Sequence, residues 1–519
     1  MFQVHSRPFL MLAGETHNSN SSTLRAMEPV WAKAKQLCLN TVLLPVTWEL
    51  LEPQEGAFTF ELVDGLIFEA RRQGLRLGLL WFGAWKNGQC TYAPAWVKTD
   101  LTRFRRAEVK KGENKSILES FHGMEYSTLS CLCQETQRAD SRAFAALMAH
   151  LKAVDEGERT VLYVQVENEP GLMGAAREHS QEADQLFAQD VPAAFAQYMR
   201  DHTGTMGEEL RTAVEAGQAS GSWEAVFGPM AEEVFQSYYV AKYIDGVAAA
   251  GKAEYDIPLA VNAWLEQGPP GSYPTGGPVS KMMEVYKFAA PHIDVVCPDI
   301  YVRNFCEVCN QYSRPDNPLL IPETATHSHA GPRLVYTVGH YHAWGFSPFG
   351  FEDMGQPFGA SEGFLFGMDT SDPLLSTPQN VDEYAWYNRT LGQLTPLLAE
   401  AYGTQRLQAV ISERPEENVM RFEQFELRAL MEPPMVTRQD GVCLALALGE
   451  DEFLVLGCGC MLRVGSTDPA KPHVDLLDAE EGELADGRWQ VHRRLNGDET
   501  ATLNLRTPTL LRLKLFAYC

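Results

Sequence analysis

The sequence predicts an α/β fold in which a (β/α)8 TIM barrel is followed by a small antiparallel β-sandwich domain. A chain of 519 residues is too long for one ordinary core, which favours a large domain with a smaller companion. From residue 1 to about 400, short apolar or β-branched runs alternate with longer helical patterns, as repeated βα units do. From about residue 405 onward, β-type runs alternate with turn residues, and helical periodicity is absent. We therefore expect the barrel to cover residues 1–400 and the sandwich to cover residues 405–519.

Eight candidate strands account for the barrel. The runs at 41–44 and 161–164 are almost continuously apolar, as expected for strands buried on both faces of a parallel sheet. Two connections, 88–140 and 170–257, are long, and we expect them to be insertions that shape a pocket. The last barrel helix is expected over 381–399, where apolar residues recur at helical spacing. The expected strands are residues 9–14, 41–47, 75–81, 160–166, 258–263, 294–300, 318–322 and 343–349.

The C-terminal part consists of short β-type runs separated by Gly, Asp and Pro turns. The runs lie at 444–448, 453–457, 500–505 and 509–517, a pattern typical of a small antiparallel sandwich. No concentrated chemical motif occurs there. We therefore expect a structural or docking role for this part rather than a catalytic one.

Composition and charge exclude several classes of protein. Hydrophobic residues make up 45% and charged residues 21%, which indicates a globular protein rather than a disordered one. The 43 basic and 68 acidic residues give a net charge of −25 with no offsetting Lys/Arg run, so we expect neither a nucleic-acid nor a membrane partner. The N-terminus lacks the apolar core of a signal peptide, and the eleven cysteines occur mostly singly in apolar contexts. These features favour a cytoplasmic protein with reduced thiols.

Polar and aromatic side chains gather directly after the predicted strands. In a TIM barrel the carboxyl ends of the strands carry the chemistry, so this one-sided distribution is what a barrel enzyme should show. The residues concerned are Glu15, His17, Asn18, Trp48, Glu49, Trp81, Lys86, Asn87, Asn168, Glu169, Trp264, Asp299, Tyr301, Glu323, Glu352 and Asp353.

The motif QVENEPG at 165–171 is the strongest local signal. A buried strand delivers an asparagine and two carboxylates at its end, a costly placement unless the charges are used or paired. Alternation puts Glu167 and Glu169 on the same side, but the chain turns at Pro170. We therefore expect Glu169 to be the one that faces the pocket.

A second apolar strand, in the motif PLLIPET at 318–324, ends in the single carboxylate Glu323. Either Glu169 or Glu323 alone is as well explained by a helix cap or a surface ion pair. Together, at the ends of the fourth and seventh strands, they supply what glycosidic cleavage needs. One carboxyl must be protonated to assist the leaving oxygen, and the other must be ionised to attack the anomeric carbon or to activate water.

These motifs carry a resemblance to a known family. The sequence resembles the clan of retaining β/α-barrel glycosidases, and within it the bacterial β-galactosidase-like branch of glycoside hydrolase family 35 that carries a small β-domain after the barrel. The likeness extends over the whole chain and is densest in the barrel. The matching stretches are 8–19, 40–48 with Glu52, Pro53, Gly56, Phe58 and Phe60, 79–88, 92–97, 165–171, 261–265, 298–301, 317–323 and 345–353.

The resemblance implies a retaining mechanism, with Glu169 as acid/base, Glu323 as nucleophile, and the two carboxyl groups about 5 to 5.5 Å apart. It also implies that Asn168 binds the sugar 2-hydroxyl and that Tyr301 orients the nucleophile. The implied substrate is a terminal, non-reducing β-linked galactose on an oligosaccharide, with no cofactor. Glucose or arabinose specificity, and a non-catalytic sugar-binding barrel, are the alternatives. The oligomeric state stays open, with a homo-oligomer as one option.

Further residues are candidates for substrate binding. Four tryptophans offer flat apolar surface to a sugar ring, although each singly is more often a core aromatic. Four polar residues are able to bind hydroxyl groups or, alternatively, to hold a loop. The tryptophans are Trp48, Trp81, Trp264 and Trp344, and the polar residues are Asn18, Lys86, Asn87 and Glu352.

No metal is expected, but two metal hypotheses are open. Cys306 and Cys309 form a lone CxxC that would need Cys131 and Cys133 to complete a structural zinc site. A metal-dependent hydrolase is the other, since three histidines lie near strand ends, but their spacing lacks a helical HxxxH-type pair. These histidines are His17, His340 and His342.

Overall fold

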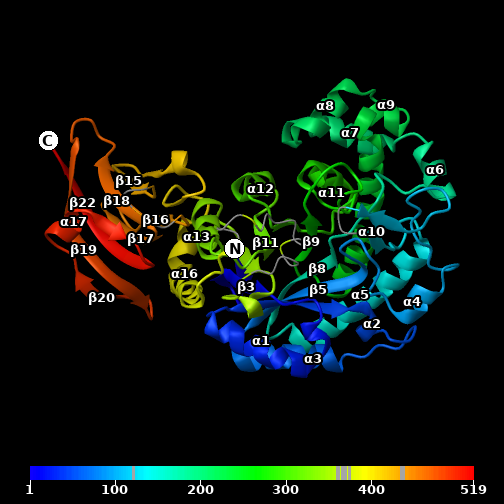
Figure 1. Cartoon of the computed structure of the whole chain (residues 1–519), viewed down its shortest axis with the longest axis horizontal. Helices are drawn as coiled ribbons and strands as arrows, with labels where there is room; N and C mark the ends of the chain where they lie inside the picture. The colour runs from blue at the N-terminus through cyan, green and yellow to red at the C-terminus, as the bar shows by residue number, and fades with distance from the viewer. Residues whose placement is uncertain (120–122, 358–362, 364–370, 372–375, 433–435, 437–438) are drawn as a thin grey trace.

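The computed structural model describes residues 1–119, 123–357, 363, 371, 376–432, 436 and 439–519. Eight parallel strands close into a barrel in the chain order β3-β4-β5-β8-β9-β10-β11-β12, which confirms the predicted fold class (Figure 1). The strands are β3 (Met11–Glu15), β4 (Thr41–Thr47), β5 (Arg76–Lys86), β8 (Val161–Asn168), β9 (Leu259–Trp264), β10 (Val295–Ile300), β11 (Leu320–Thr324) and β12 (Gly345–Pro348).

Each barrel strand is followed by a helix that packs outside it. Local signals set their ends: the side chain of Thr23 accepts a hydrogen bond from the Ala26 amide at the start of the first helix. Gly74, at a φ of 73°, ends the second. The helices are α1 (Leu24–Gln36), α3 (Glu61–Gln73), α5 (Gln134–Asp155), α10 (Ala231–Glu254), α11 (Met283–Ala289), α12 (Phe305–Tyr312), α13 (Ala330–His340) and α16 (Val381–Ala401).

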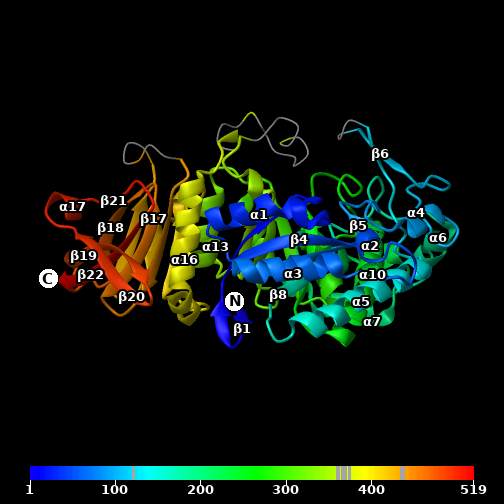
Figure 2. The same ribbon diagram turned by 90° about the horizontal axis from the view of Figure 1, so that it is seen from below.

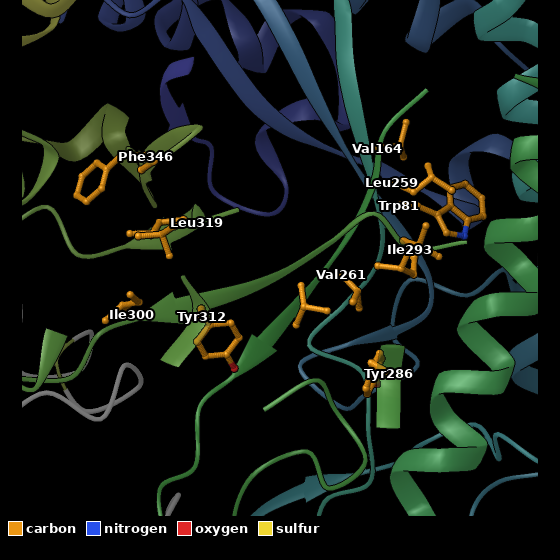
Figure 3. Packing of buried hydrophobic residues seen from close by; sticks show 14 of the residues in the cluster. Trp81, Val164, Leu259, Val261, Tyr286, Ile293, Ile300, Tyr312, Leu319 and Phe346 are labelled. Atoms are coloured by element: carbon orange, nitrogen blue, oxygen red, sulfur yellow. The ribbon is translucent and has the colours of Figure 1, made fainter. Parts of the chain in front are cut away.

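The main apolar core lies between the strands and the surrounding helices. Figure 3 shows Trp81 beside Val164 and Leu259 in this layer. A second cluster fills the barrel interior, and the N-terminal hairpin of β1 (Phe2–Val4) and β2 (Arg7–Phe9) closes its lower end. This hairpin was not predicted. Its two strands have only three residues each, which is too short to show a periodic pattern. Phe9 was instead assigned to the predicted strand 9–14.

The two long insertions differ in their role. The first contains α4 (Ala95–Thr99) and the hairpin of β6 (Ser116–Leu118) and β7 (Met124–Tyr126), and it contributes to the pocket as expected. The second forms a cluster of helices beside α10, away from the barrel mouth (Figure 1). It packs apolar side chains against α10 rather than shaping the pocket. Its helices are α6 (Gln181–Phe187), α7 (Ala193–Asp201), α8 (Glu208–Ala216) and α9 (Trp223–Phe227).

The C-terminal part forms two antiparallel sheets, as predicted. The larger sheet has the order β13-β16-β17-β22-β19-β20, and the smaller has the order β14-β15-β18-β21. An apolar cluster that draws residues from both sheets lies between them. The strands are β13 (Leu407–Ile411), β14 (Val419–Arg421), β15 (Phe425–Leu430), β16 (Val442–Ala447), β17 (Glu452–Cys458), β18 (Cys460–Ser466), β19 (His473–Ala485), β20 (Arg488–Arg494), β21 (Leu503–Leu505) and β22 (Thr509–Tyr518).

Strands β13, β16 and β17 of the larger sheet are buried on both faces. One face joins the cluster between the sheets, while the other, with Leu444, Leu446 and Leu456, belongs to the same apolar core as the barrel. Helices α13 and α16 lie between this sheet and the barrel strands (Figure 2). The C-terminal module is therefore packed onto the barrel rather than tethered to it.

No helix in the described parts of the chain combines the length and the apolar character that a bilayer-spanning segment requires.

Candidate active site

A pocket of about 700 Å³ lies at the carboxyl ends of the barrel strands, where TIM-barrel active sites are built. Side chains from seven of the eight barrel strands or the loops after them line it. The polar and aromatic lining residues include His17, Asn18, Lys86, Asn87, Gln89, Tyr92, Tyr126, Glu169, Trp264, Gln267, Asp299, Tyr301, Glu323, Thr326, Phe349 and Asp353.

The end of β8 presents Glu169 to this pocket through an unusual backbone path. Glu167 and Glu169 both have positive φ angles, 63° and 44°, in the left-handed region that side chains rarely adopt. The amide of Glu169 donates a 2.9 Å hydrogen bond to Oδ1 of Asn262 on β9, which holds the chain in this path. Strain of this kind persists only where the surroundings enforce it, and it concentrates at functional sites.

Glu167 points away from the pocket, as predicted. One of its carboxylate oxygens accepts a 2.8 Å hydrogen bond from the amide of Trp85. Burial, followed by the charge of Asp140 on α5, raises the pKa of Glu167 well above its usual range. Burial likewise raises the pKa of Asp140, so the two neighbouring acids each disfavour ionisation of the other behind the end of β8.

Glu323, at the end of β11, receives two hydrogen bonds that fix its orientation. Nδ2 of Asn168 lies 3.2 Å from one of its oxygens, and the hydroxyl of Tyr301 donates to the other at 2.9 Å. The two donors satisfy both oxygens of the Glu323 carboxylate and hold it in one orientation. Sequence analysis placed both partners in the site.

The structure brings Glu169 and Glu323 together from the ends of β8 and β11, two barrel strands separated by β9 and β10. An oxygen of each, together with one of Asp299, lies within 4.8 Å of the others. All three side chains are buried.

Burial and the charge of Glu323 raise the pKa of Glu169 to about 8, although Lys86 and a hydrogen bond with Asp299 partly oppose this. Glu169 is therefore protonated at neutral pH. The site thus contains one carboxyl able to give a proton and another held by hydrogen-bond donors.

Lys86 is the buried cation of the site. Its Nζ donates a 2.7 Å hydrogen bond to Oδ1 of Asn168, which leaves the Asn168 amide group facing Glu323. Burial alone would lower the pKa of Lys86, but Glu323, Glu169 and other nearby carboxylates raise it overall. Lys86 thus offsets part of the negative charge of the pocket.

Two acidic residues of the site were not singled out from the sequence. Asp299, on β10, accepts a 2.8 Å hydrogen bond from Nδ2 of Asn262, the residue that also anchors Glu169. Glu15, at the end of β3, is fully buried, and burial followed by the charge of Glu323 raises its pKa well above its usual range. Glu15 directly follows a predicted strand and Asp299 lies near the end of one, so both were grouped with the polar residues at strand ends, but position alone did not rank them above their neighbours.

Most of the predicted binding residues line the pocket. Asn18, Lys86, Asn87, Trp264 and Tyr301 do so directly, and Asn168 reaches the site through Glu323.

Trp48 and Trp81 do not reach the pocket, which corrects their assignment. Each is fully buried and donates its indole N–H to a carboxylate, Trp48 to Glu52 and Trp81 to Asp140, both at 2.8 Å. For Trp81 the reason is that β5 continues to Lys86, so this residue lies inside the strand and faces the helix layer.

Trp344 and Glu352 are also reassigned. Trp344 packs edge-to-face on Phe2, at the lower end of the barrel, because it precedes β12 instead of following it. Glu352 accepts a 2.8 Å hydrogen bond from the amide of His17 and another from Asn20, and so holds the loop after β3. It is the neighbouring Asp353 that lines the pocket.

The metal hypotheses receive no geometric support. Within the described ranges, Glu169, Asp299 and Glu323 form the only group of three or more potential ligand residues that is close enough to hold an ion. Cys306 and Cys309 are buried thiols on α12. His340 and His342 stack on tyrosine rings instead of facing the pocket.

A family model described as a domain of unknown function, DUF5597, matches residues 385–506. No curated protein matches the chain. The structure is similar to a β-galactosidase from Bacillus circulans sp. alkalophilus, with a TM-score of 0.47 and 15% identity over 75% of this chain. A β-galactosidase from Rahnella sp. R3 gives a TM-score of 0.47 and 13% identity over 75% of this chain.

The chain spans 57% of the length of each of these two enzymes. A catalytic mutant of a GH42 β-galactosidase from G. stearothermophilus is similar over nearly all of both chains, 97% of this one and 98% of the other. Its TM-score is 0.47 and its identity is 10%.

Proposed function

We propose that this chain is a retaining β-glycosidase that releases terminal β-linked galactose from oligosaccharides. The proposal depends on one observation. Glu169 and Glu323 face each other with oxygens within 4.8 Å, and burial beside Glu323 raises the pKa of Glu169 to about 8. A glycosidase needs one protonated and one ionised carboxyl group, and unlike surroundings are what separate the pKa values of two such groups.

In the first step, an ionised oxygen of Glu323 forms a bond to the anomeric carbon while the glycosidic C–O bond breaks. Glu169 gives its proton to the departing oxygen. In the second step, Glu169 takes a proton from water, the water oxygen bonds to the anomeric carbon, and Glu323 leaves. Tyr301 and Asn168 hold Glu323 during both steps.

The short separation of the two carboxylates supports retention. An inverting enzyme needs room for a water molecule between base and sugar, and its carboxyl groups lie about 6.5–9.5 Å apart. An oxygen of each carboxyl lies within 4.8 Å of the other, which is nearer to the roughly 5–5.5 Å of retaining enzymes than to this range.

Galactose is favoured over glucose and arabinose by the resemblance of the motifs. These sugars differ at only a few positions, so a small number of pocket contacts determines which of them is bound best. Candidates for these contacts are the polar residues of the pocket rim, among them Asn18, Asn87 and Gln267.

The test is a panel of nitrophenyl β-glycosides with the wild type, Glu169→Ala and Glu323→Ala. We expect galactoside to be the best substrate and the Glu323 variant to lose at least about a thousandfold in kcat. The Glu169 variant should keep activity on good leaving groups and should form a β-glycosyl azide when azide is added, because azide needs no general base. Glu417→Ala, which removes a carboxylate 47% exposed on the surface, is the control and should behave as wild type.

A non-catalytic sugar-binding barrel is the competing function. It predicts saturable binding of galactosides by calorimetry with no turnover in the wild type. Full activity of Glu323→Ala would contradict the assigned nucleophile.

A further inference from the structure

A carboxylate of the C-terminal module lies buried against the barrel. Glu413 follows β13 and lies within the region matched by the domain of unknown function. Its side chain is 16% exposed and accepts two hydrogen bonds from Arg333 on α13, at 2.8 and 2.9 Å. It also lies 2.9 Å from Nδ1 of His329, the residue that precedes α13. A fork-to-fork pair of this kind fixes both partners in space.

Arg333 in turn contacts both loops that carry the nucleophile and its partner. Its guanidinium lies 4.4 Å from the ring centre of Phe305, four residues after Tyr301. Its Nη1 lies 3.4 Å from Nε2 of His327, four residues after Glu323.

The segment between Glu323 and α13 reaches the pocket at Thr326. This residue is one position before His327, and its side chain lines the pocket. Thr326, His327, His329 and Arg333 are all buried. A displacement of the guanidinium is therefore transmitted by packed neighbours instead of being absorbed by solvent.

Glu413 is the carboxylate that balances this buried guanidinium. Burial alone would raise the pKa of Glu413, but Arg333 and His329 hold it well below its usual range. Removing one partner of a buried pair leaves an uncompensated charge, which must move toward water or draw water in. Either change would disturb the packing of Phe305 and His327.

We propose that Glu413 is a positioning residue of the C-terminal module. Through Arg333 it holds the segments 301–305 and 323–327 so that Tyr301 and Glu323 keep the positions that catalysis requires. This inference rests on the proposed glycosidase function for its effect on rate. It gives the module a role in the active site although no residue of the module lines the described part of the pocket.

The test compares Glu413→Gln with Glu417→Gln, a change at a surface carboxylate of the same module. For Glu413→Gln we expect faster hydrogen exchange in peptides that cover 301–305 and 323–329, and a kcat lower by about 10- to 100-fold, as for small misplacements of reacting groups. KM should change by less than about threefold, because the sugar contacts on the other strands are intact. The Glu417 variant should match the wild type in each measurement.

Glu413→Asp keeps the charge and provides a second variant should Glu413→Gln fail to fold. It should give a smaller change in the same direction. A folded Glu413 variant with unchanged loop exchange and unchanged kcat overturns the proposal, even if its melting temperature falls. If the wild type cleaves no glycoside, the proposed function fails, and the exchange comparison alone then decides whether Glu413 positions the loops.

Discussion

At the scale of single residues, Glu169 and Glu323 owe their different roles to their neighbours. Glu323 receives hydrogen bonds from Asn168 and Tyr301. The side chain of Glu169 is buried beside Glu323 and Asp299. Protonation of Glu169 removes the repulsion between its negative charge and that of Glu323.

The pKa of Glu169 predicts how activity depends on pH. Because the proposed mechanism requires a protonated Glu169, kcat/KM should fall as the pH rises through an apparent pKa near 8. The profile should be measured with a substrate whose leaving group needs protonation. Glu169→Gln should abolish this alkaline limb on an activated substrate, and a limb that persists in that variant would assign it to another group.

The same pKa makes a prediction for stability. The folded-state pKa of Glu169, about 8, lies above its ordinary value of 4.5, so the folded protein holds a proton that the unfolded chain releases. Its contribution to stability is present below about pH 4.5 and is lost as the pH rises through 8. In thermal melts, the Tm of Glu169→Gln relative to that of the wild type should therefore rise by about 1–3 °C between pH 5 and pH 9.

The sequence reveals residues of this kind when each ends a buried apolar run, because a charge there is costly unless it is used. That argument found Glu169 and Glu323. It cannot predict which way an aromatic side chain points, because a tryptophan occurs in an apolar core as readily as in a binding pocket. Trp48 and Trp81 were misplaced for this reason. Asp299 was grouped with the polar residues at the strand ends but was given no role, because its local sequence does not distinguish it from its neighbours.

At the scale of elements, the ends of β5 and β8 form the rigid part of the site. β5 runs on to Lys86 through a register shift against β8, which lets Lys86 lie opposite Asn168. The sequence predicted the end of β5 at residue 81, because the following Phe-Gly-Ala-Trp does not continue the aliphatic run. The larger C-terminal sheet was incompletely predicted for a similar reason: β19 alternates exposed charges with half-buried residues and lacks an apolar run.

Gly83 in β5 tests this rigidity. A Cβ there would lie 2.4 Å from Nε1 of Trp81, 2.7 Å from Oδ1 of Asp140 and 2.8 Å from Oε1 of Glu167. Gly83→Ala should therefore lower the free energy of unfolding by about 1–3 kcal/mol, and it should lower kcat because Glu167 leads directly to Glu169. Denaturant unfolding and kinetics measure both effects.

Gly157→Ala is the matched control for that substitution, since nothing lies within 4 Å of its added Cβ. It should leave both quantities within about 0.5 kcal/mol and twofold of wild type. A fully stable and active Gly83→Ala variant would show that Asp140 and Glu167 can move without a loss of stability or activity.

At the scale of the whole molecule, the barrel and the C-terminal sheets share one apolar core. Leu444 on β16 is 1% exposed and lies in the cluster that also contains the barrel helices. Strands β13, β16 and β17 are buried on both faces, so they lose the apolar cover of one face if the barrel unfolds. We therefore expect the two parts to unfold together, in a single calorimetric transition.

Leu444→Ala is the substitution that tests this coupling. It should lower the free energy of unfolding by about 2–5 kcal/mol while the transition stays single, because the cavity lies in the shared core. Leu477→Ala, at a leucine of β19 that is 62% exposed, should change stability by less than about 0.5 kcal/mol. If Leu444→Ala instead splits the melt into an early and a late transition, the sheets unfold independently of the barrel. A module that unfolds first, while the barrel remains folded, would leave Arg333 without its carboxylate partner, so activity should then be lost with the earlier of the two transitions.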